Sequence, residues 1–349
     1  MSDDETSAHR RRARYSGTHP RRFEEKYKEQ APEQYPETVA KVRASGKTPA
    51  GMHVPIMVAE VLDVLAPRPG EVVVDCTLGY GGHARELLPR VLPGGLLLGL
   101  DVDPIELPKT EARLRLAGFG PDVFRVRRSN FAGLPKALAE EGVALADGVL
   151  ADLGASSMQL DAPDRGFSFK TGGPLDMRMN PRRGQPASAL LSRIAPRDLA
   201  ALLDEVDEPE ASRLADALAG QPFDDTRALA DAVRGALAHR RDEEGELSVR
   251  RVFLALRIAV NEEFHALETF LRQLPQCLAP GGRVAILTFH SGEDRRVKKA
   301  FLAGLREGHY ASIADDVVRP GRDECYANPR AKSAKLRWAI QGAGGVRQG

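Results

Sequence analysis

Cysteines, long apolar runs and an excess of one charge sign are all scarce in this sequence of 349 residues. The three cysteines, Cys76, Cys277 and Cys325, are odd in number and far apart, so we expect reduced thiols rather than a disulfide framework or a cysteine metal site. No apolar run approaches the ~18 residues that a membrane span needs. The N-terminus is polar, so we also expect no secretory signal. These absences predict a cytoplasmic protein that has no membrane segment.

The charges nearly cancel, because Lys and Arg number 50 and Asp and Glu number 49, which leaves a net charge of +1. This balance excludes a protein that binds nucleic acid through its overall charge, but it does not exclude local basic patches. Residues 1–50 hold one such patch and few aliphatic residues, which predicts a basic, disordered extension. The alternative is an arm that contacts RNA phosphates, and the sequence does not decide between the two. The arginines of this patch are Arg10, Arg11, Arg12, Arg14, Arg21 and Arg22.

Apolar runs alternate with helical patterns from residue 51 to about residue 152. Strands of continuous apolar residues that alternate with helices are typical of a parallel sheet covered on both faces. The α/β pattern resumes near residue 284, so we predict a doubly wound core formed by residues 51–160 and 246–349. The expected strands are 72–74, 96–100, 123–126, 148–152 and 284–289, and the expected helices between them include 106–116 and 134–141.

Residues 161–245 interrupt this pattern, because they carry no strong strand signal and are rich in proline at first. Helical patterns then follow at 197–206, 209–219 and 226–239, so we predict an all-helical insertion and assign it to substrate recognition. Residues 249–274 predict one long amphipathic helix. Residues 334–340 predict an edge strand, whose basic side chains either protect a solvated edge or form a phosphate-binding rim.

A glycine-rich turn follows the first expected strand. Gly79, Gly81 and Gly82 lie in this turn, and Asp101 ends the next strand, 22 residues after Gly79. Glycine lets the backbone approach a ligand closely, and a helix N-terminus directs amide donors at it. An acid at the end of the second strand can accept hydrogen bonds from both ribose hydroxyls. The turn therefore predicts an adenosine-containing cofactor, either a nicotinamide dinucleotide or S-adenosylmethionine.

Two more acids favour S-adenosylmethionine. Asp75 stands just before the turn, where a carboxylate would repel a pyrophosphate but would suit a cationic sulfonium or the amino group of methionine. Asp152 ends the fourth strand and is expected at the same edge of the sheet. His83 begins the helix after the turn, where it is either a donor to the carboxylate of the cofactor or a surface histidine with another partner.

The segment after Asp152 gathers hydroxyls, arginines and aromatic rings within about thirty residues, including 152–161 (DLGASSMQLD) and 165–169 (RGFSF). Such a combination suits stacking on a single-stranded or flipped base and contact with its phosphates. The alternative is a packed, ordered loop. The candidate substrate-binding residues are Arg165, Phe167, Phe169, Arg178, Arg330 and Lys332. The candidate catalytic residues are Asp152, Ser156 and His290, and a Ser–His hydrolase is excluded because no G-x-S-x-G turn is present.

Taken together, these stretches resemble the bacterial small-subunit ribosomal RNA cytosine-N4 methyltransferase family, often called RsmH or MraW. The resemblance spans about residues 51–340, and its most specific motifs are 152–161 and 328–337 (NPRAKSAKLR). The other matching segments are 53–55, 79–83, 101–104, 130–131, 165–169, 174–179, 255–262 and 289–295.

The resemblance implies a class I S-adenosylmethionine-dependent methyltransferase with an inserted helical domain. No metal is expected, because no His/Cys/carboxylate cluster has ligand spacing. The resemblance also implies methylation of the exocyclic amino group of a cytosine in small-subunit ribosomal RNA, near the decoding (P) site. We expect direct in-line attack of the amino nitrogen on the sulfonium methyl, with Asp152 or a carbonyl of residues 153–156 holding an amino proton. The cofactor contacts carried over from the family are Gly81, Gly82, His83, Asp101, Phe131, Asp152 and Gln159.

The sequence also departs from the pattern of that family. Gly292 stands where leucine is usual, Val102 where arginine is usual, and residues 207–210 and 247–251 differ as well. The 50-residue extension is unusual for the family. Three alternatives therefore stay open: an NAD-dependent oxidoreductase, a non-catalytic RNA-binding protein, and a methyltransferase for another RNA or a DNA cytosine. The oligomeric state is not predicted, and a homodimer is one option.

Overall fold

The computed structural model of this chain describes residues 55–343, so the prediction for residues 1–50 lies outside the described residues. The strands are β1 (Val72–Asp75), β2 (Leu96–Asp101), β3 (Phe124–Arg128), β4 (Ala146–Asp152), β5 (Leu278–Thr288), β6 (Tyr310–Ile313) and β7 (Lys335–Gln341). The α-helices are α3 (Val58–Leu65), α4 (Gly82–Val91), α5 (Glu106–Leu116), α6 (Leu134–Glu140), α7 (Ser157–Asp161), α8 (Ala187–Leu191), α9 (Pro196–Asp204), α10 (Ala211–Leu218), α11 (Thr226–Ala236), α12 (Asp242–Asn261), α13 (Glu263–Gln273), α14 (Ser291–Arg306) and α15 (Arg322–Ala327). Short 3-10 helices are η2 (Phe131–Gly133), η3 (Pro163–Arg165), η4 (Leu274–Gln276) and η5 (Pro329–Ser333).

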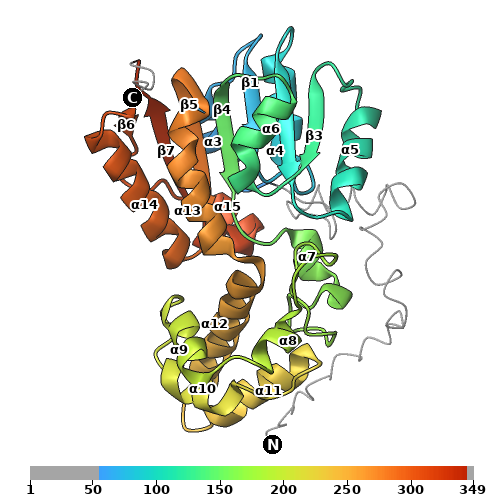
Figure 1. The fold of residues 1–349 in the computed structure, drawn as a ribbon, viewed down its shortest axis with the longest axis vertical. Coiled ribbons are helices and arrows are strands. Elements are labelled where there is room, and N and C mark those ends of the chain that lie inside the picture. Colours follow the sequence, from blue (N-terminus) through green and yellow to red (C-terminus); the bar gives the residue numbers. More distant parts are fainter. Residues whose placement is uncertain (1–54, 344–349) are drawn as a thin grey trace, which may run out of the picture. The chain divides into compact units, whose positions relative to one another are not determined.

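The strands form one sheet in the order β3-β2-β1-β4-β5-β7-β6 (Figure 1). β1 to β5 are parallel, whereas β7 runs antiparallel to both β5 and β6. This topology confirms the predicted doubly wound, mostly parallel sheet. The order reverses between β1 and β4, and in such sheets ligands bind at the carboxyl ends of the strands beside that reversal.

The prediction of an edge strand near residue 334 was wrong, because β7 lies between β5 and β6. Its basic side chains are occupied inside the protein. Arg337 Nε donates to Asp294 Oδ1 over 2.6 Å, and Lys335 Nζ lies 3.3 Å from Asp294 Oδ2. These two residues therefore hold helix α14 against the sheet rather than forming a rim for phosphates.

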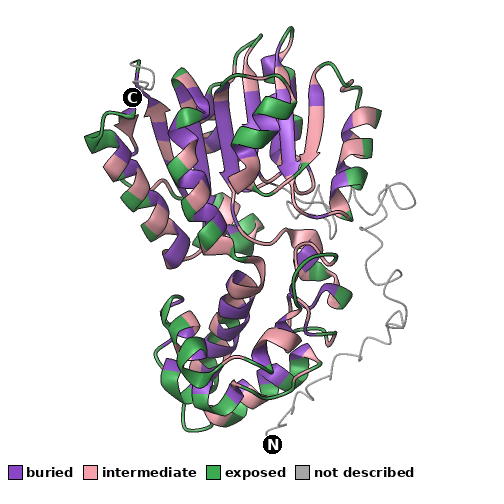
Figure 2. Ribbon diagram, in the orientation of Figure 1, coloured by how far each residue is buried: buried purple, intermediate pink, exposed green. Residues whose placement is uncertain are grey.

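Neighbouring apolar residues along each central strand pack on opposite faces of the sheet. Val73 and Leu97 pack with α3, α4 and α5, whereas Val74 and Leu98 pack with α6, α13 and α14. Figure 2 shows the central strands buried along most of their length, while the covering helices expose their outer sides. This double coverage explains why the strands appear in the sequence as continuous apolar runs.

The chain between β4 and β5 forms helices, and α8 to α12 enclose a hydrophobic core of their own. The predicted single helix over 249–274 was wrong, because α12 ends at Asn261 and α13 begins at Glu263. Glu262 adopts a left-handed conformation with φ of 51°, and this turns the chain at the junction. No helix within residues 55–343 combines the length and the apolar character that crossing a membrane requires.

Candidate active site

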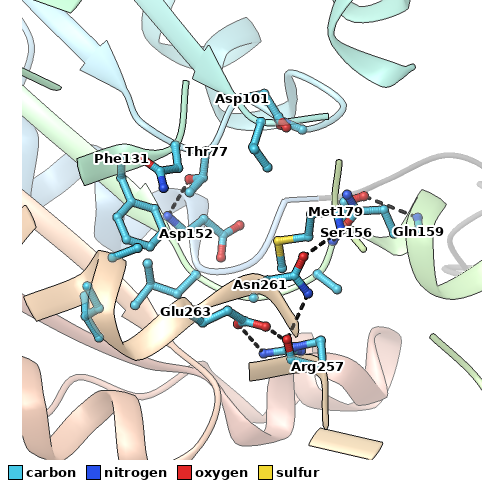
Figure 3. A pocket seen from close by; sticks show the side chains of 18 of the residues that line it. Thr77, Asp101, Phe131, Asp152, Ser156, Gln159, Met179, Arg257, Asn261 and Glu263 are labelled. Atoms are coloured by element: carbon cyan, nitrogen blue, oxygen red, sulfur yellow. Dashed lines mark hydrogen bonds and ion pairs between the residues drawn. The ribbon is translucent and has the colours of Figure 1, made fainter. Parts of the chain in front are cut away.

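A cavity of about 930 Å³ lies at the carboxyl ends of the strands and extends to the α12–α13 junction. One side is formed by the turn after β1, the ends of β2 and β4, and η2. The other side is formed by the loop after β4, by residues 179–185 and by the junction. Figure 3 shows labelled side chains from both sides around this space, among them Asp101, Asp152 and Asn261.

The glycine turn is tied to the end of β2 by hydrogen bonds. Asp101 Oδ2 accepts from the Gly79 N–H over 2.7 Å, and Asp101 Oδ1 accepts from the Asp103 N–H over 2.8 Å. Gly79 and Gly82 line the cavity with Asp101, but Gly81 is not among the lining residues. Gly81 has φ of +80°, and a Cβ there would lie 2.9 Å from Thr110 Cγ2, so the turn and its packing against α5 both require glycine.

Asp152 stands at the centre of the cavity wall. Its N–H donates to Thr77 Oγ1 over 2.6 Å, and its carboxylate Oδ2 lies 3.7 Å from His83 Nδ1. His83 also contacts the backbone, with Nε2 3.0 Å from the carbonyl oxygen of Ile56. Burial raises the pKa of Asp152 to about 8, and the charges of Asp75 and Glu293 act in the same direction.

Asp101 resembles Asp152 in this respect, since burial raises its pKa to about 6 although three backbone N–H groups oppose the shift. Raised pKa values mean that ionisation of these acids is unfavourable until a positive charge arrives. A pyrophosphate would make the ionised forms still less favourable, whereas a sulfonium or ammonium group would stabilise them. The wall formed by Asp101 and Asp152 therefore suits a cationic ligand that also carries ribose hydroxyls.

Asp75 was expected to face that cation, and this was wrong. It is 1% exposed and is not among the residues that line the cavity. Its Oδ1 accepts from the Thr77 N–H over 3.1 Å, and burial raises its pKa to about 7. Asp75 acts on the site through Asp152, whose pKa it helps to raise.

Phe131, Ser156 and Gln159 line the cavity, but they differ in how free their side chains are. The Phe131 ring packs edge-on against Phe270 with centroids 5.6 Å apart. Ser156 Oγ accepts from the Gln159 N–H over 3.3 Å and caps α7, so the structure gives this predicted catalytic hydroxyl a structural role. The Gln159 amide accepts from the Ser156 N–H and donates to Asp103 Oδ2 over 2.9 Å.

The structure buries Arg165 and Phe167, which corrects their assignment as RNA contacts. Arg165 is 8% exposed, and its Nη1 donates to Asp103 Oδ2 over 2.8 Å. Its Nη2 donates to the carbonyls of Arg178 and Met179 over 3.1 and 2.9 Å. Phe167 is 7% exposed and belongs to the core of the helical region. Both side chains support the loop rather than facing its surface.

The other predicted substrate and catalytic residues are spread around the cavity. Arg330 lines it and pairs with Asp161 over 2.6 Å, whereas exposed Lys332 does not line it. Phe169 packs on Phe253, and Arg178 pairs with Asp176 over 2.6 Å. His290 also lies outside the lining, because its Nε2 is 3.1 Å from Glu293 Oε1 and its ring packs near Phe264. The structure therefore places the predicted catalytic residue His290 outside the cavity lining.

The sequence interpretation missed several residues that line the cavity, among them Arg257, Asn261 and Glu263. Arg257 Nε and Nη2 donate to Glu263 Oε1 and Oε2 over 2.8 and 2.9 Å. Asn261 Oδ1 accepts from the Met179 N–H over 2.7 Å, and its Nδ2 donates to the Met177 carbonyl over 2.8 Å. The sequence held an indication of this, because 255–262 is among the segments that resemble the family. The predicted amphipathic helix over 249–274 explained the same residues as part of a hydrophobic core.

A family profile described as the MraW methylase family matches residues 50–341. Among curated relatives, "Ribosomal RNA small subunit methyltransferase H 1" of Lachnoclostridium phytofermentans is 48% identical and covers 97% of this chain and 95% of its own. "Ribosomal RNA small subunit methyltransferase H 2" of Alkaliphilus metalliredigens is 48% identical and covers 97% of this chain and 99% of its own. The corresponding protein H 1 of Agathobacter rectalis is 46% identical and covers 97% of this chain and 99% of its own.

Alignments that cover 97% of this chain reach into residues 1–50. These relatives therefore share most of the N-terminal extension that the sequence analysis described as unusual for the family.

Proposed function

Because the chain belongs to the MraW methylase family, we propose that it methylates the exocyclic N4 amino group of a cytosine in small-subunit ribosomal RNA, near the decoding site. The enzyme is a methyltransferase, and its cofactor is S-adenosylmethionine. The names of relatives at 46% to 48% identity support ribosomal RNA as the substrate. The N4 position and the site in the RNA are supported by the motif resemblance. A cytoplasmic location is part of the same proposal.

The observation that carries this proposal is the continuity of one cavity across two regions. Asp101 and Asp152 line it at the carboxyl edge of the sheet, and Met179 and Asn261 line it beside the helical region. Pockets for single small ligands measure about 300–1,000 Å³. A volume of about 930 Å³ is at the upper end of that range, so it leaves room for a target base beside the cofactor.

The residues present fit the cofactor. Asp101 would accept hydrogen bonds from the ribose hydroxyls with the lone pairs that Gly79 and Asp103 leave available. The N–H groups at the start of α4, with Gly82 and His83, would meet the methionine carboxylate. The Phe131 ring would pack against the adenine, and Gln159 would act mainly by fixing the loop. Bound S-adenosylmethionine supplies the electrophilic methyl group and a positive charge.

Asp152 would hold and orient the attacking amino group. The lone pair of that nitrogen is delocalised into the ring, so it is a weak nucleophile. An acceptor for one amino proton favours a more sp³-like nitrogen, and fixed positioning can contribute several kcal/mol. Asp152 would be ionised as an acceptor beside a bound sulfonium, because a nearby positive charge lowers a raised carboxyl pKa. After methyl transfer the surplus amino proton would leave to water.

The mouth of the cavity would meet the RNA backbone. Arg183 and Arg330 line the cavity and are exposed, and Lys332 is exposed beside Arg330. Phosphate contacts fix the register of a nucleic acid, while contacts to the base edge provide selectivity. Residues 179–185 of the helical region would present Arg183 to the RNA, and η5, just before β7, would present Arg330 and Lys332.

Mass-spectrometric nucleoside mapping of ribosomal RNA from cells with and without the gene tests this proposal. We expect N4-methylcytidine to disappear from one site, and to return with the intact gene but not with Asp152→Asn. Unchanged N4-methylcytidine would contradict the proposed reaction. Loss of a different methylated nucleoside would leave the methyltransferase in place but overturn the proposed base.

A further inference from the structure

Arg257 is a cationic hydrogen-bond donor with a fixed position, on the wall of the cavity opposite Asp101. Its side chain is 16% exposed and lines the cavity. Glu263 holds the guanidinium through Nε and Nη2, with distances of 2.8 and 2.9 Å. Within residues 55–343, no hydrogen-bond acceptor is recorded for Nη1. One N–H₂ group is therefore held in place without a partner from the described part of the chain.

The guanidinium lies beside the turn that follows the reaction centre. Gly154 is two residues beyond Asp152, and a Cβ added there would lie 3.7 Å from both Nη1 and Nη2 of Arg257. Gly154 has φ of +97°, which disfavours other residues and keeps this approach open. In Figure 3, Asp152 appears between Asp101 and the Arg257–Glu263 pair. A base whose amino group reaches Asp152 would therefore pass close to Nη1.

The position of Arg257 is set by several elements at once. Its carbonyl accepts from Asn261 Nδ2 over 2.8 Å, and Asn261 also binds Met177 and Met179. Burial would lower the pKa of Arg257, but the charges of Glu263 and Glu293 outweigh it, so the pKa is raised. The donor remains charged, and hydrogen bonds from charged donors are stronger than neutral ones.

We propose that Arg257 is a specificity-determining residue that recognises the ring edge of the target cytosine through Nη1. This inference rests on the proposed function. Cytosine carries an amino donor next to the acceptors N3 and O2, which complements an acceptor at Asp152 and a donor at Arg257. Uracil presents an acceptor at position 4, so it mismatches Asp152, and a donor at N3, so it also mismatches Arg257 where Nη1 binds N3 rather than O2. Buried groups that lose their partners discriminate strongly against such analogues.

A double-mutant cycle that combines substitutions in the protein with base analogues in the RNA tests this inference. The proteins are wild type, Arg257→Met, Arg257→Lys and the control Arg250→Met, which replaces an exposed arginine on the same helix α12. The RNAs are decoding-site fragments with cytidine, 3-deazacytidine or 2-thiocytidine at the target position. The measurements are kcat/KM for methyl transfer and the affinity for S-adenosylhomocysteine by calorimetry.

We expect Arg257→Met to lower kcat/KM on cytidine by about 10- to 100-fold, as loss of a hydrogen bond to a charged group implies. For the wild type, one of the two analogues should lower kcat/KM by a similar factor relative to cytidine. For Arg257→Met, the same analogue should lower kcat/KM little further. Arg250→Met should behave like the wild type, and the cofactor product should bind all proteins within about twofold. Arg257→Lys keeps the charge without the held N–H₂ group and should show an intermediate loss.

If both analogues lower kcat/KM by the same factor for Arg257→Met as for the wild type, the losses are additive, and this result would overturn the inference. Additive losses with a smaller salt dependence for the variant would assign Nη1 to a phosphate instead. If Arg257→Met binds S-adenosylhomocysteine poorly, the same comparison between the wild type and Arg257→Lys on the three RNAs decides whether Nη1 contacts the base. Failure of the wild type to methylate any of these RNAs would count against the proposed function, and the two failures are therefore distinguishable.

Discussion

The two sides of the cavity balance their charges in opposite ways. At the sheet edge, burial raises the pKa of Asp101 to about 6 and that of Asp152 to about 8, and neither has an arginine partner among the described residues. On the helical side, Glu263 lines the cavity and binds Arg257 over 2.8 and 2.9 Å. Asp176, just outside the lining, is partly buried too, but Arg178 lowers its pKa. The sheet edge thus gains its counter-charge only with a cationic ligand, whereas the helical side is neutralised within the protein.

Replacing Asp152 with asparagine should have the largest effect, because it removes the acceptor at the centre of the sheet side. We expect turnover at saturating cofactor to fall by about 10³-fold, comparable to the loss of one preorganised polar group at a reaction centre. Single-turnover transfer of labelled methyl groups measures this rate. Affinity for S-adenosylhomocysteine, measured in parallel, should change far less. Near-normal turnover would show that a backbone carbonyl, rather than Asp152, is the acceptor.

The counterpart on the helical side is Arg165→Met, which should act on stability. It would leave Asp103, 1% exposed, as an uncompensated buried charge and would remove the bonds to two carbonyls. We expect the free energy of unfolding in urea to fall by about 3 kcal/mol.

Two further variants sharpen the result for Arg165. Asp103→Asn combined with Arg165→Met should recover part of the loss, because both charges are then absent. Arg330→Met breaks an exposed pair with Asp161 and should cost less than about 1 kcal/mol. A stable Arg165→Met protein that binds RNA weakly would instead restore the original interpretation of Arg165 as an RNA contact.

Asp101→Asn should weaken the cofactor rather than the chemistry. The variant keeps the shape of the side chain but loses a charged acceptor for the ribose, so we expect affinity for S-adenosylmethionine to fall on the order of tenfold. Turnover at saturating cofactor should stay close to that of the wild type. Calorimetry provides the affinity, and Asp122→Asn, at an exposed position, is the matched control. Unchanged affinity would contradict the ribose assignment.

The sheet side could be predicted from the sequence because its signals are local. Each central strand is an apolar run, and the acids Asp101 and Asp152 directly follow such runs. Parallel strands end at the same edge of a sheet, so residues that are far apart in sequence meet there without any detailed packing argument. Asp75 was the exception, because its carboxylate turns onto the Thr77 N–H two residues on, which strand position does not reveal.

The helical side could not be predicted in the same way, because pairings over long sequence distances decide it. Arg165 and Asp103 are separated by 62 positions, and nothing in either segment indicates that they meet. Arg165 and Phe167 have the composition of a nucleic-acid contact, yet packing buries both. The break at Glu262 was missed because the apolar spacing continues across it. The same break places Glu263 where it holds Arg257.

The smallest effect should be a dependence on pH that differs in sign between the two sides. A carboxyl group whose pKa is raised by folding adds stability that is complete below its unfolded value and is lost as pH rises through the folded value. For Asp101 that loss runs from about pH 4 to about pH 6, and for Asp152 it continues to about pH 8. The loss amounts to at most about 1.4 kcal/mol per pH unit for each proton released. Asp176, in the helical region, has a lowered pKa, so its contribution is lost only in acid. The melting temperature without cofactor should therefore fall from pH 6 to pH 8, and Asp152→Asn should flatten that fall.

S-adenosylmethionine should bind more tightly as pH rises over the same interval, because its positive charge favours the ionised acids. S-adenosylhomocysteine lacks the sulfonium, so its affinity should change less. A wild-type melting temperature and cofactor affinity that stay constant across this interval would mean that the sheet side already holds its counter-charge, and the contrast between the two sides would not hold.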